Sequence, residues 1–178
     1  GSDGDQIDAG TDGSRDVVLG DNGYALFDTE EVLVEIASTD TAFGGDDTIV
    51  TADGFDVVLG GSGDDNIDAG TDGSRDVVVG DHGYAFFDAV MGSSLLREIG
   101  TSDAEHGGAD TIVTADGFDV VLGGSGGDNI DTGTDASRDV VLGDNGYALF
   151  DTEEVLVEIA STDTAFGGDD DIVVGDGD

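Results

Sequence analysis

The sequence contains no cysteine, no proline and no tryptophan, and only four of its 178 residues are arginine or lysine. Without cysteine there are no disulfides and no thiolate metal sites. Against those four cations stand 43 acidic side chains, which give a formal net charge of −39 at pH 7. Nucleic-acid grooves require clustered lysine and arginine, and anionic membranes repel such a chain, so neither is expected as a partner. The apolar runs are only a few residues long, which predicts no transmembrane segment.

High charge favours disorder, because self-repulsion opposes collapse. Two features oppose that interpretation: 37% of the residues are hydrophobic and recur at fixed intervals, and the aspartates stand beside 32 glycines. This combination predicts a chain that binds a cation in order to fold. The sequence starts at Gly1 without a methionine, as an excerpt or a processed piece would.

A long repeat organises the chain. Residues 14–47 recur unchanged at 137–170, and a middle copy starts at Ser74. The middle copy is three residues longer within 88–97, and an insertion confined to one stretch indicates a loop or an excursion. We therefore expect a single repeat domain over 1–178, with long repeats at about 14–73, 74–136 and 137–178 (partial), and with 1–13 as the end of a preceding repeat.

A shorter repeat lies inside the long one. The nonamer Gly60-Gly-Ser-Gly-Asp-Asp-Asn-Ile-Asp68 fits Gly-Gly-x-Gly-x-Asp-x-U-x at every specified position, where U is a large apolar residue. Two series of U positions share the spacing 9, 9, 11 and 9. They are Ile49, Val58, Ile67, Val78 and Phe87, and then Ile112, Val121, Ile130, Val141 and Phe150.

This spacing has a direct physical interpretation. The glycines permit tight turns, and each x-U-x triplet is a short strand with one side chain pointing inward. Two half-turns make one coil of a two-sheet parallel solenoid, in which each coil covers only its neighbours. Six strand slots per long repeat would give three coils, and residues 32–36 are the candidate for the sixth slot.

These nonamers resemble the repeats-in-toxin family, the hemolysin-type calcium-binding nonapeptides. The resemblance covers nearly the whole chain except about 29–43, 89–106 and 152–166. It implies an all-β fold: a right-handed parallel β-roll or β-solenoid with two sheets and Ca²⁺ in the turns, interrupted by short excursions.

Turns rich in carbonyl oxygens and aspartates are suited to hard cations, and Ca²⁺ accepts six to eight oxygens in loose geometry. The resemblance implies that sixth-position aspartates of stacked turns share each Ca²⁺ and that glycine carbonyls complete the site. The expected pairs are Asp47 with Asp65 and Asp110 with Asp128 on one edge, and Asp56 with Asp76 and Asp119 with Asp139 on the other. The candidate metal residues are Asp5, Asp16, Asp47, Asp53, Asp56, Gly60, Gly61, Gly63, Asp65, Asp76, Asp110, Asp116, Asp119, Gly123, Gly124, Gly126, Asp128, Asp139 and Asp170.

Three alanines depart from this pattern. Ala25, Ala85 and Ala148 stand where the aspartate is expected, so the turns before Phe27, Phe87 and Phe150 are expected to bind calcium poorly or not at all, with Asp21, Asp81 and Asp144 as substitute carboxylates. The alternative is that all these aspartates only decorate polar turns. Carboxylates this close would repel one another without a cation, which favours the metal interpretation.

No catalytic arrangement is predicted. Gly123–Gly127 matches Gly-x-Ser-x-Gly by letter, but the equivalent residues 60–64 break the pattern, and His82 and His106 are expected to be solvated turn residues. We therefore expect no enzyme activity in this segment. Three arginines precede Asp-Val-Val strands, and two interpretations stay open for them: bridges between carboxylates of adjacent coils, or solvated ion pairs. They are Arg15, Arg75 and Arg138.

An apolar ladder is expected on the outside of one sheet. Because the middle residue of each Asp-Val-Val-Leu strand points inward, its neighbours point outward. The excursion around 32–36 folds over this ladder, or a second chain binds it as a partner surface. The residues are Val17, Leu19, Val57, Leu59, Val77, Val79, Val120, Leu122, Val140 and Leu142.

The expected function is a calcium-binding structural or adhesive repeat segment of a large secreted or cell-surface bacterial protein, folding on extracellular Ca²⁺. Self-association, head-to-tail or lateral, into fibres or a surface layer is part of this expectation. Two alternatives remain: a non-catalytic secretion or folding appendage of an exported toxin or hydrolase, and a disordered acidic cation-binding chain.

Overall fold

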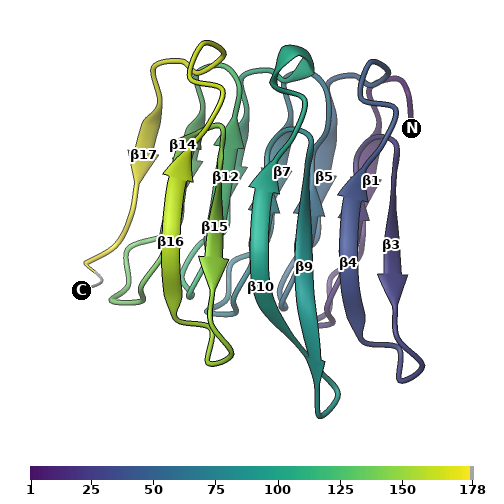
Figure 1. Cartoon of the computed structure of the whole chain (residues 1–178), viewed down its shortest axis with the longest axis vertical. Helices are drawn as coiled ribbons and strands as arrows, with labels where there is room; N and C mark the ends of the chain where they lie inside the picture. The colour runs from purple at the N-terminus through teal and green to yellow at the C-terminus, as the bar shows by residue number, and fades with distance from the viewer. Residues whose placement is uncertain (177–178) are drawn as a thin grey trace.

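The computed structural model describes residues 1–176, which form an all-β structure with parallel and antiparallel sheets and one short 3₁₀ helix, η1 (Ala104–His106). Figure 1 shows the antiparallel sheet as the front layer, with the parallel strands behind it and the termini at opposite ends of the sheets. Among the described residues, no helix has the length and apolarity needed to cross a membrane.

Sheet A is parallel and is built from three-residue strands. Its central residues stack directly on one another, as in the register Ile49 on Ile67 and Ile112 on Ile130. In sheet order the strands are β1 (Gln6–Asp8), β5 (Thr48–Val50), β7 (Asn66–Asp68), β11 (Thr111–Val113), β13 (Asn129–Asp131) and β17 (Asp171–Val173).

Sheet B is also parallel, and the chain visits it between successive strands of sheet A. One strand of sheet A, the turn after it and the next strand of sheet B are called a coil below. The sheet B strands, in sheet order, are β14 (Val140–Asp144), β12 (Val120–Gly124), β8 (Val77–Val79), β6 (Val57–Leu59) and β2 (Val17–Leu19).

The central residue of each short strand points between sheets A and B. Ile49, Val58, Ile67 and Val78 are all buried in one apolar cluster, as the spacing predicts. Phe87 is not in this cluster, although it occupies the next position of the series. It lies in the second cluster, on the opposite side of sheet B.

Sheet C is antiparallel and consists of three hairpins that follow β2, β8 and β14. Its outer members lie at the two ends of the structure, and neighbouring hairpins pair with each other through β4 with β9 and β10 with β15. The strands, in sheet order, are β16 (Leu156–Ser161), β15 (Gly146–Phe150), β10 (Ser93–Thr101), β9 (Gly83–Val90), β4 (Leu33–Ser38) and β3 (Gly23–Phe27).

The hairpins correct two predictions. Residues 32–36 contribute to β4 of sheet C and are not a sixth parallel slot, so each long repeat holds two coils and a hairpin rather than three coils. Ala25, Ala85 and Ala148 lie inside hairpin strands and not in turns. Phe87 lies nine residues after Val78, as in the parallel strands, but it belongs to a hairpin strand. An antiparallel strand also alternates its side chains between two faces, so an apolar residue can fall at this interval without a parallel strand.

Sheet C covers the apolar ladder of sheet B. Val57, Leu59, Val120 and Leu122 are at most 1% exposed and share a cluster with Leu96 and other hairpin residues. Val17, Leu19 and Leu142 are partly buried against the same cluster, and Val77, Val79 and Val140 belong to it. The assignment of this ladder as a partner surface is therefore wrong: the chain's own hairpins bury it.

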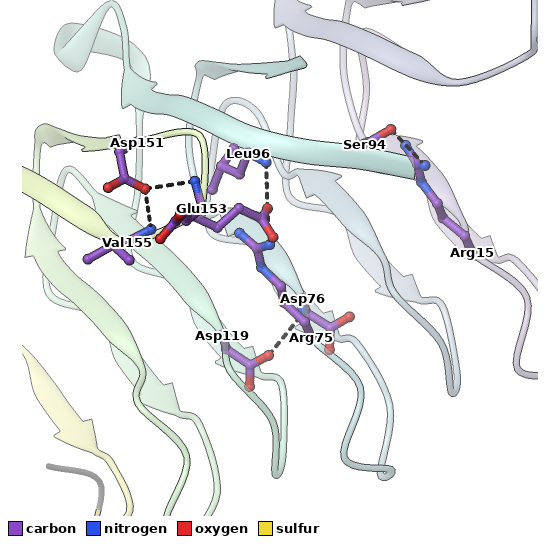
Figure 2. A network of polar contacts seen from close by, with 10 residues as sticks. Arg15, Arg75, Asp76, Ser94, Leu96, Asp119, Asp151, Glu153 and Val155 are labelled. Carbon is purple, nitrogen blue, oxygen red and sulfur yellow. Dashed lines mark hydrogen bonds and ion pairs between the residues drawn. The ribbon is translucent and has the colours of Figure 1, made fainter. Parts of the chain in front are cut away.

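Two arginines, Arg15 and Arg75, connect the hairpins to the coils. The Arg75 guanidinium lies 5.1 Å from the Phe118 ring and 5.7 Å from the Phe55 ring, and it pairs with Glu154 at the tip of the third hairpin. Arg15 also lies over the Phe55 ring, 5.1 Å from its centroid. It donates to Ser94 Oγ of β10 at 2.9 Å (Figure 2). These partners of Arg15 and Arg75 are not the aspartates of adjacent coils that were expected to be bridged. These guanidinium groups join layers by stacking as well as by charge.

Candidate metal centre

The aspartates that immediately precede the strands of sheet A form a continuous ladder, called the sheet A ladder. In each step, a backbone N–H donates to Oδ1 of the aspartate in the next coil, as from Asp47 to Asp65 at 2.7 Å and from Asp110 to Asp128 at 2.9 Å. The two predicted pairs on this edge are therefore neighbours. The full series is Asp5, Asp47, Asp65, Asp110, Asp128 and Asp170.

The second carboxylate oxygen of the sheet A ladder has no partner. Oδ2 of Asp47, Asp65, Asp110 and Asp128 is buried without a hydrogen bond, and each of these residues is only 2% exposed. A buried unsatisfied carboxylate oxygen is costly, more so than a neutral group. Four such oxygens in consecutive coils indicate a site for a positively charged ligand.

Glycine carbonyls lie beside these unpaired oxygens. A Cβ added to Gly60 would lie 2.4 Å from Asp65 Oδ2 and 2.0 Å from the carbonyl oxygen of Gly80. A Cβ on Gly123 would likewise lie 2.2 Å from both Asp128 Oδ2 and the Gly143 carbonyl oxygen. Each glycine thus leaves a space, called a seat below, that is lined by one carboxylate oxygen and one carbonyl oxygen. The same arrangement pairs Asp47 Oδ2 with the Gly60 carbonyl and Asp110 Oδ2 with the Gly123 carbonyl.

The α-ammonium group of Gly1 holds the corresponding position at the amino end of the ladder. It donates to the carbonyl oxygen of Gly20 at 2.6 Å and lies 3.1 Å from Asp5 Oδ2. Asp5 and Gly20 occupy the same relative positions around their coil as Asp65 and Gly80 do around theirs.

A second set of carboxylates lines the same edge. Asp81 Oδ1 accepts the N–H of Gly108 at 2.9 Å, its Oδ2 accepts the N–H of Ser125, and its side chain is buried. Asp21 accepts the N–H of Ser62, and its Oδ1 is buried without a partner. Asp144 accepts the N–H of Gly168. The sequence indicated these three aspartates only as substitutes for missing ligands, whereas here they join the sheet A ladder to the loops that return from the hairpins.

The aspartates that precede the strands of sheet B form a second ladder, called the sheet B ladder. Here too the backbone N–H of one aspartate donates to Oδ1 of the next, as from Asp76 to Asp119 at 2.7 Å (Figure 2). The predicted pairs on this edge are again neighbours, because Asp56 donates to Asp76 and Asp119 donates to Asp139. Asp16 begins the series.

In part of the sheet B ladder, threonine hydroxyls donate hydrogen bonds to the Oδ2 atoms of the aspartates. Thr114 Oγ1 donates to Asp119 Oδ2 at 2.7 Å, and Thr132 Oγ1 donates to Asp139 Oδ2 at 2.6 Å. Thr51 stands at the place equivalent to Thr114. At Asp119 and Asp139, Oδ2 is therefore already hydrogen-bonded. On the sheet A ladder, Oδ2 is the oxygen that remains available to a cation.

Burial raises the pKa of the ladder aspartates, and neighbouring carboxylates raise it further. The pKa rises to about 8 for Asp65 and to about 10 for Asp110 in the sheet A ladder, and to about 9 for Asp76 in the sheet B ladder. It rises to about 7 for Asp81, Asp119 and Asp128. Without a cation, the folded chain at neutral pH favours protonated carboxyl groups at Asp65, Asp76 and Asp110.

The other predicted metal residues have turn roles. Asp53 and Asp116 accept exposed hydrogen bonds from Thr71 and Thr134, outside the buried ladders. Gly61 and Gly124 adopt left-handed φ values of 126° and 123°, as the turn requires. Gly63 and Gly126 also have positive φ in the same two turns.

The histidine prediction is wrong for His82, which is fully buried, with Nε2 3.3 Å from Ser62 Oγ. The hairpin that follows encloses it, which turn chemistry alone does not indicate. His106 is partly exposed, and its Nδ1 lies 3.3 Å from Asp103. Ser125 Oγ donates to the carbonyl oxygen of Ala104 and accepts from Asn145 at 3.0 Å, and neither partner is a general base.

Among the described residues, no three His, Cys, Asp or Glu side chains converge as a metal cluster. Any seat on the sheet A ladder thus combines few carboxylates with backbone carbonyls, a set suited to Ca²⁺ rather than to Zn²⁺. Comparison of the chain with protein-family models, curated proteins and solved structures finds no match.

Proposed function

We propose that this chain is a calcium-binding structural or adhesive segment of a secreted or cell-surface bacterial protein, with sheets A and B forming a β-roll that calcium stabilises. The observation that carries the proposal is the row of four buried, unpartnered Oδ2 atoms, each beside a glycine carbonyl. The resemblance of the nonamers to repeats-in-toxin sequences supports the same conclusion.

The residues that would hold the ions are the aspartates of the sheet A ladder and the glycines that face them. When bound, Ca²⁺ supplies positive charge to a line of carboxylates that would otherwise need protons. Because ions that bind only the folded chain stabilise it by mass action, calcium binding is coupled to folding. No catalytic role is proposed for any residue.

The oxygen set also suits an extracellular location. Sites with few carboxylates resemble extracellular calcium modules, which bind in the 10⁻⁴–10⁻³ M range and would stay empty at cytosolic calcium levels. A chain with a net charge of −39 would then stay open before export and fold outside the cell. End-to-end association of such segments remains a prediction, to be measured by light scattering across calcium concentrations.

Far-UV circular dichroism during a calcium titration tests the proposal, with the chain first freed of divalent ions at pH 7.5. We expect a cooperative gain of β signal at submillimolar to millimolar Ca²⁺, and little gain with Mg²⁺, which demands a stricter octahedron. A spectrum that stays coil-like at 10 mM Ca²⁺ would refute it and favour the disordered acidic chain. Equal responses to the two ions would refute a calcium-specific site.

A further inference from the structure

The two ladders share their first contact and differ in their second. In both, Oδ1 of each aspartate accepts a backbone N–H from the preceding coil, as in Asp110 with Asp65 and Asp119 with Asp76. Both of these acceptors are at most 2% exposed. Their chemical difference lies in the second oxygen, because Asp110 Oδ2 has no partner whereas Asp119 Oδ2 accepts the Thr114 hydroxyl.

The residue at the start of each turn explains this difference. Before the sheet A ladder the turns begin with glycine, such as Gly60 and Gly123, which leaves room beside the carboxylate. Before Asp119 and Asp139 of the sheet B ladder, the corresponding residue is threonine, whose hydroxyl fills that room and supplies a hydrogen. A hydroxyl that donates to a carboxylate oxygen satisfies it without any ion.

Two aspartates of the sheet B ladder, Asp16 and Asp76, have no threonine at this place, because the corresponding residues are Ala9 and Ala69. Asp56 has the threonine but not the hydrogen bond. Its Oδ2 and the Thr51 hydroxyl are both buried, and neither forms a hydrogen bond that meets the usual geometry. Burial raises the pKa of Asp56, and Thr51, at the place from which Thr114 reaches its aspartate, partly offsets that rise. The positive charge of Arg15 also acts on this carboxylate.

The surrounding charge favours the sheet A ladder as well. Asp81 and Asp21 add buried carboxylates there, and both interact electrostatically with Asp65. The sheet A ladder therefore combines additional buried carboxylates with a series of unpaired carboxylate oxygens.

We propose that cations bind along the sheet A ladder, and that the hydroxyls of Thr114 and Thr132 close the sheet B ladder to metal at Asp119 and Asp139. This inference rests on the proposed function, because it assigns the calcium of that proposal to one of two edges. It also departs from what the sequence resemblance implies, in which turns on both edges hold calcium. Where Thr114 or Thr132 begins the turn, the chain's own hydrogen bond thus takes the oxygen that a cation would bind in the glycine turns of the other edge.

A matched pair of substitutions tests the assignment. Asp110→Asn and Asp119→Asn remove one charged oxygen from equally buried aspartates on opposite edges, and both keep an oxygen to accept the backbone N–H. Calcium bound per chain is measured by equilibrium dialysis with elemental analysis, alongside the midpoint of the calcium-induced dichroism change. We expect Asp110→Asn to lose at least one bound ion and to raise the midpoint about tenfold or more. We expect Asp119→Asn to keep the parent's ion count and a midpoint within about twofold.

A second pair, Asp128→Asn and Asp139→Asn, repeats the comparison if a member of the first pair does not fold. Equal losses of calcium within a pair, or a loss confined to the sheet B ladder, would overturn the inference while leaving the proposed function intact. A parent chain that binds no calcium would instead refute the proposed function itself.

Discussion

Gly60→Ala is the most direct test of the oxygen seats. The added methyl carbon would lie 2.0 Å from the Gly80 carbonyl oxygen and 2.4 Å from Asp65 Oδ2, whereas ordinary contact begins at 3.4 Å. The first of these neighbours is backbone of the adjacent coil, so relief requires two paired coils to separate by more than an ångström. The same methyl would fill the seat proposed for a cation.

The size of the effect follows from this geometry. Overpacking a well-packed interior costs about 1–3 kcal/mol, and a clash with paired backbone belongs at the upper end. For a chain of this length each kcal/mol lowers Tm by about 2–4 °C, so about 3 kcal/mol corresponds to about 6–12 °C. The calcium midpoint should rise as well, because one seat is lost.

Thermal unfolding at saturating calcium, followed by circular dichroism, measures this effect. Gly73→Ala is the matched control, because a Cβ there meets nothing within 4 Å and its φ is not left-handed. That control should be neutral or more stable by up to about 1 kcal/mol. If Gly60→Ala melts within about 2 °C of Gly73→Ala, the close approach of glycine, carbonyl and carboxylate is wrong.

Three further predictions follow from burial and charge. Burial raises the pKa of Asp110 to about 10 and of Asp76 to about 9, against an ordinary value of 3.8. Folding without calcium therefore takes up protons, so Tm in calcium-free buffer should be highest near pH 4 and fall as the pH rises toward 9; a maximum at neutral pH contradicts this. Leu33→Ala should cost about 2–5 kcal/mol in urea unfolding, because Leu33 is fully buried. Leu156→Ala, in an identical sequence segment but 38% exposed, should cost much less, and equal costs would contradict burial by the neighbouring hairpin. Arg75→Lys should lose about 1 kcal/mol, since lysine keeps the charge but not the planar group stacked between two phenylalanine rings; an unchanged Tm would count against that stacking.

Local spacing was sufficient to predict the short parallel strands. A nine-residue unit contains its own turn glycines, its own inward residue and its own aspartate, so Ile49, Val58 and Ile67 could be placed without knowing any distant contact. The neighbouring aspartate pairs, such as Asp47 with Asp65, are those that the resemblance to calcium-binding nonapeptides implies. Sequence spacing failed at Phe87, because a hairpin strand can imitate the nine-residue interval while belonging to another sheet.

The sequence by itself determined the repeat and the alternation of turns and strands, because both depend on residues within one or two coils. Only the tertiary structure decided what covers the Val/Leu ladder, since β4 meets β9 across some 50 residues of chain, and many non-local pairings are compatible with one apolar pattern. It also decided that Asp81 and His82 are buried, because the returning hairpin encloses them. The difference between the two ladders likewise appears only in three dimensions: a threonine and a glycine at the same motif position both permit a turn, but only threonine fills the space beside the carboxylate of its own turn.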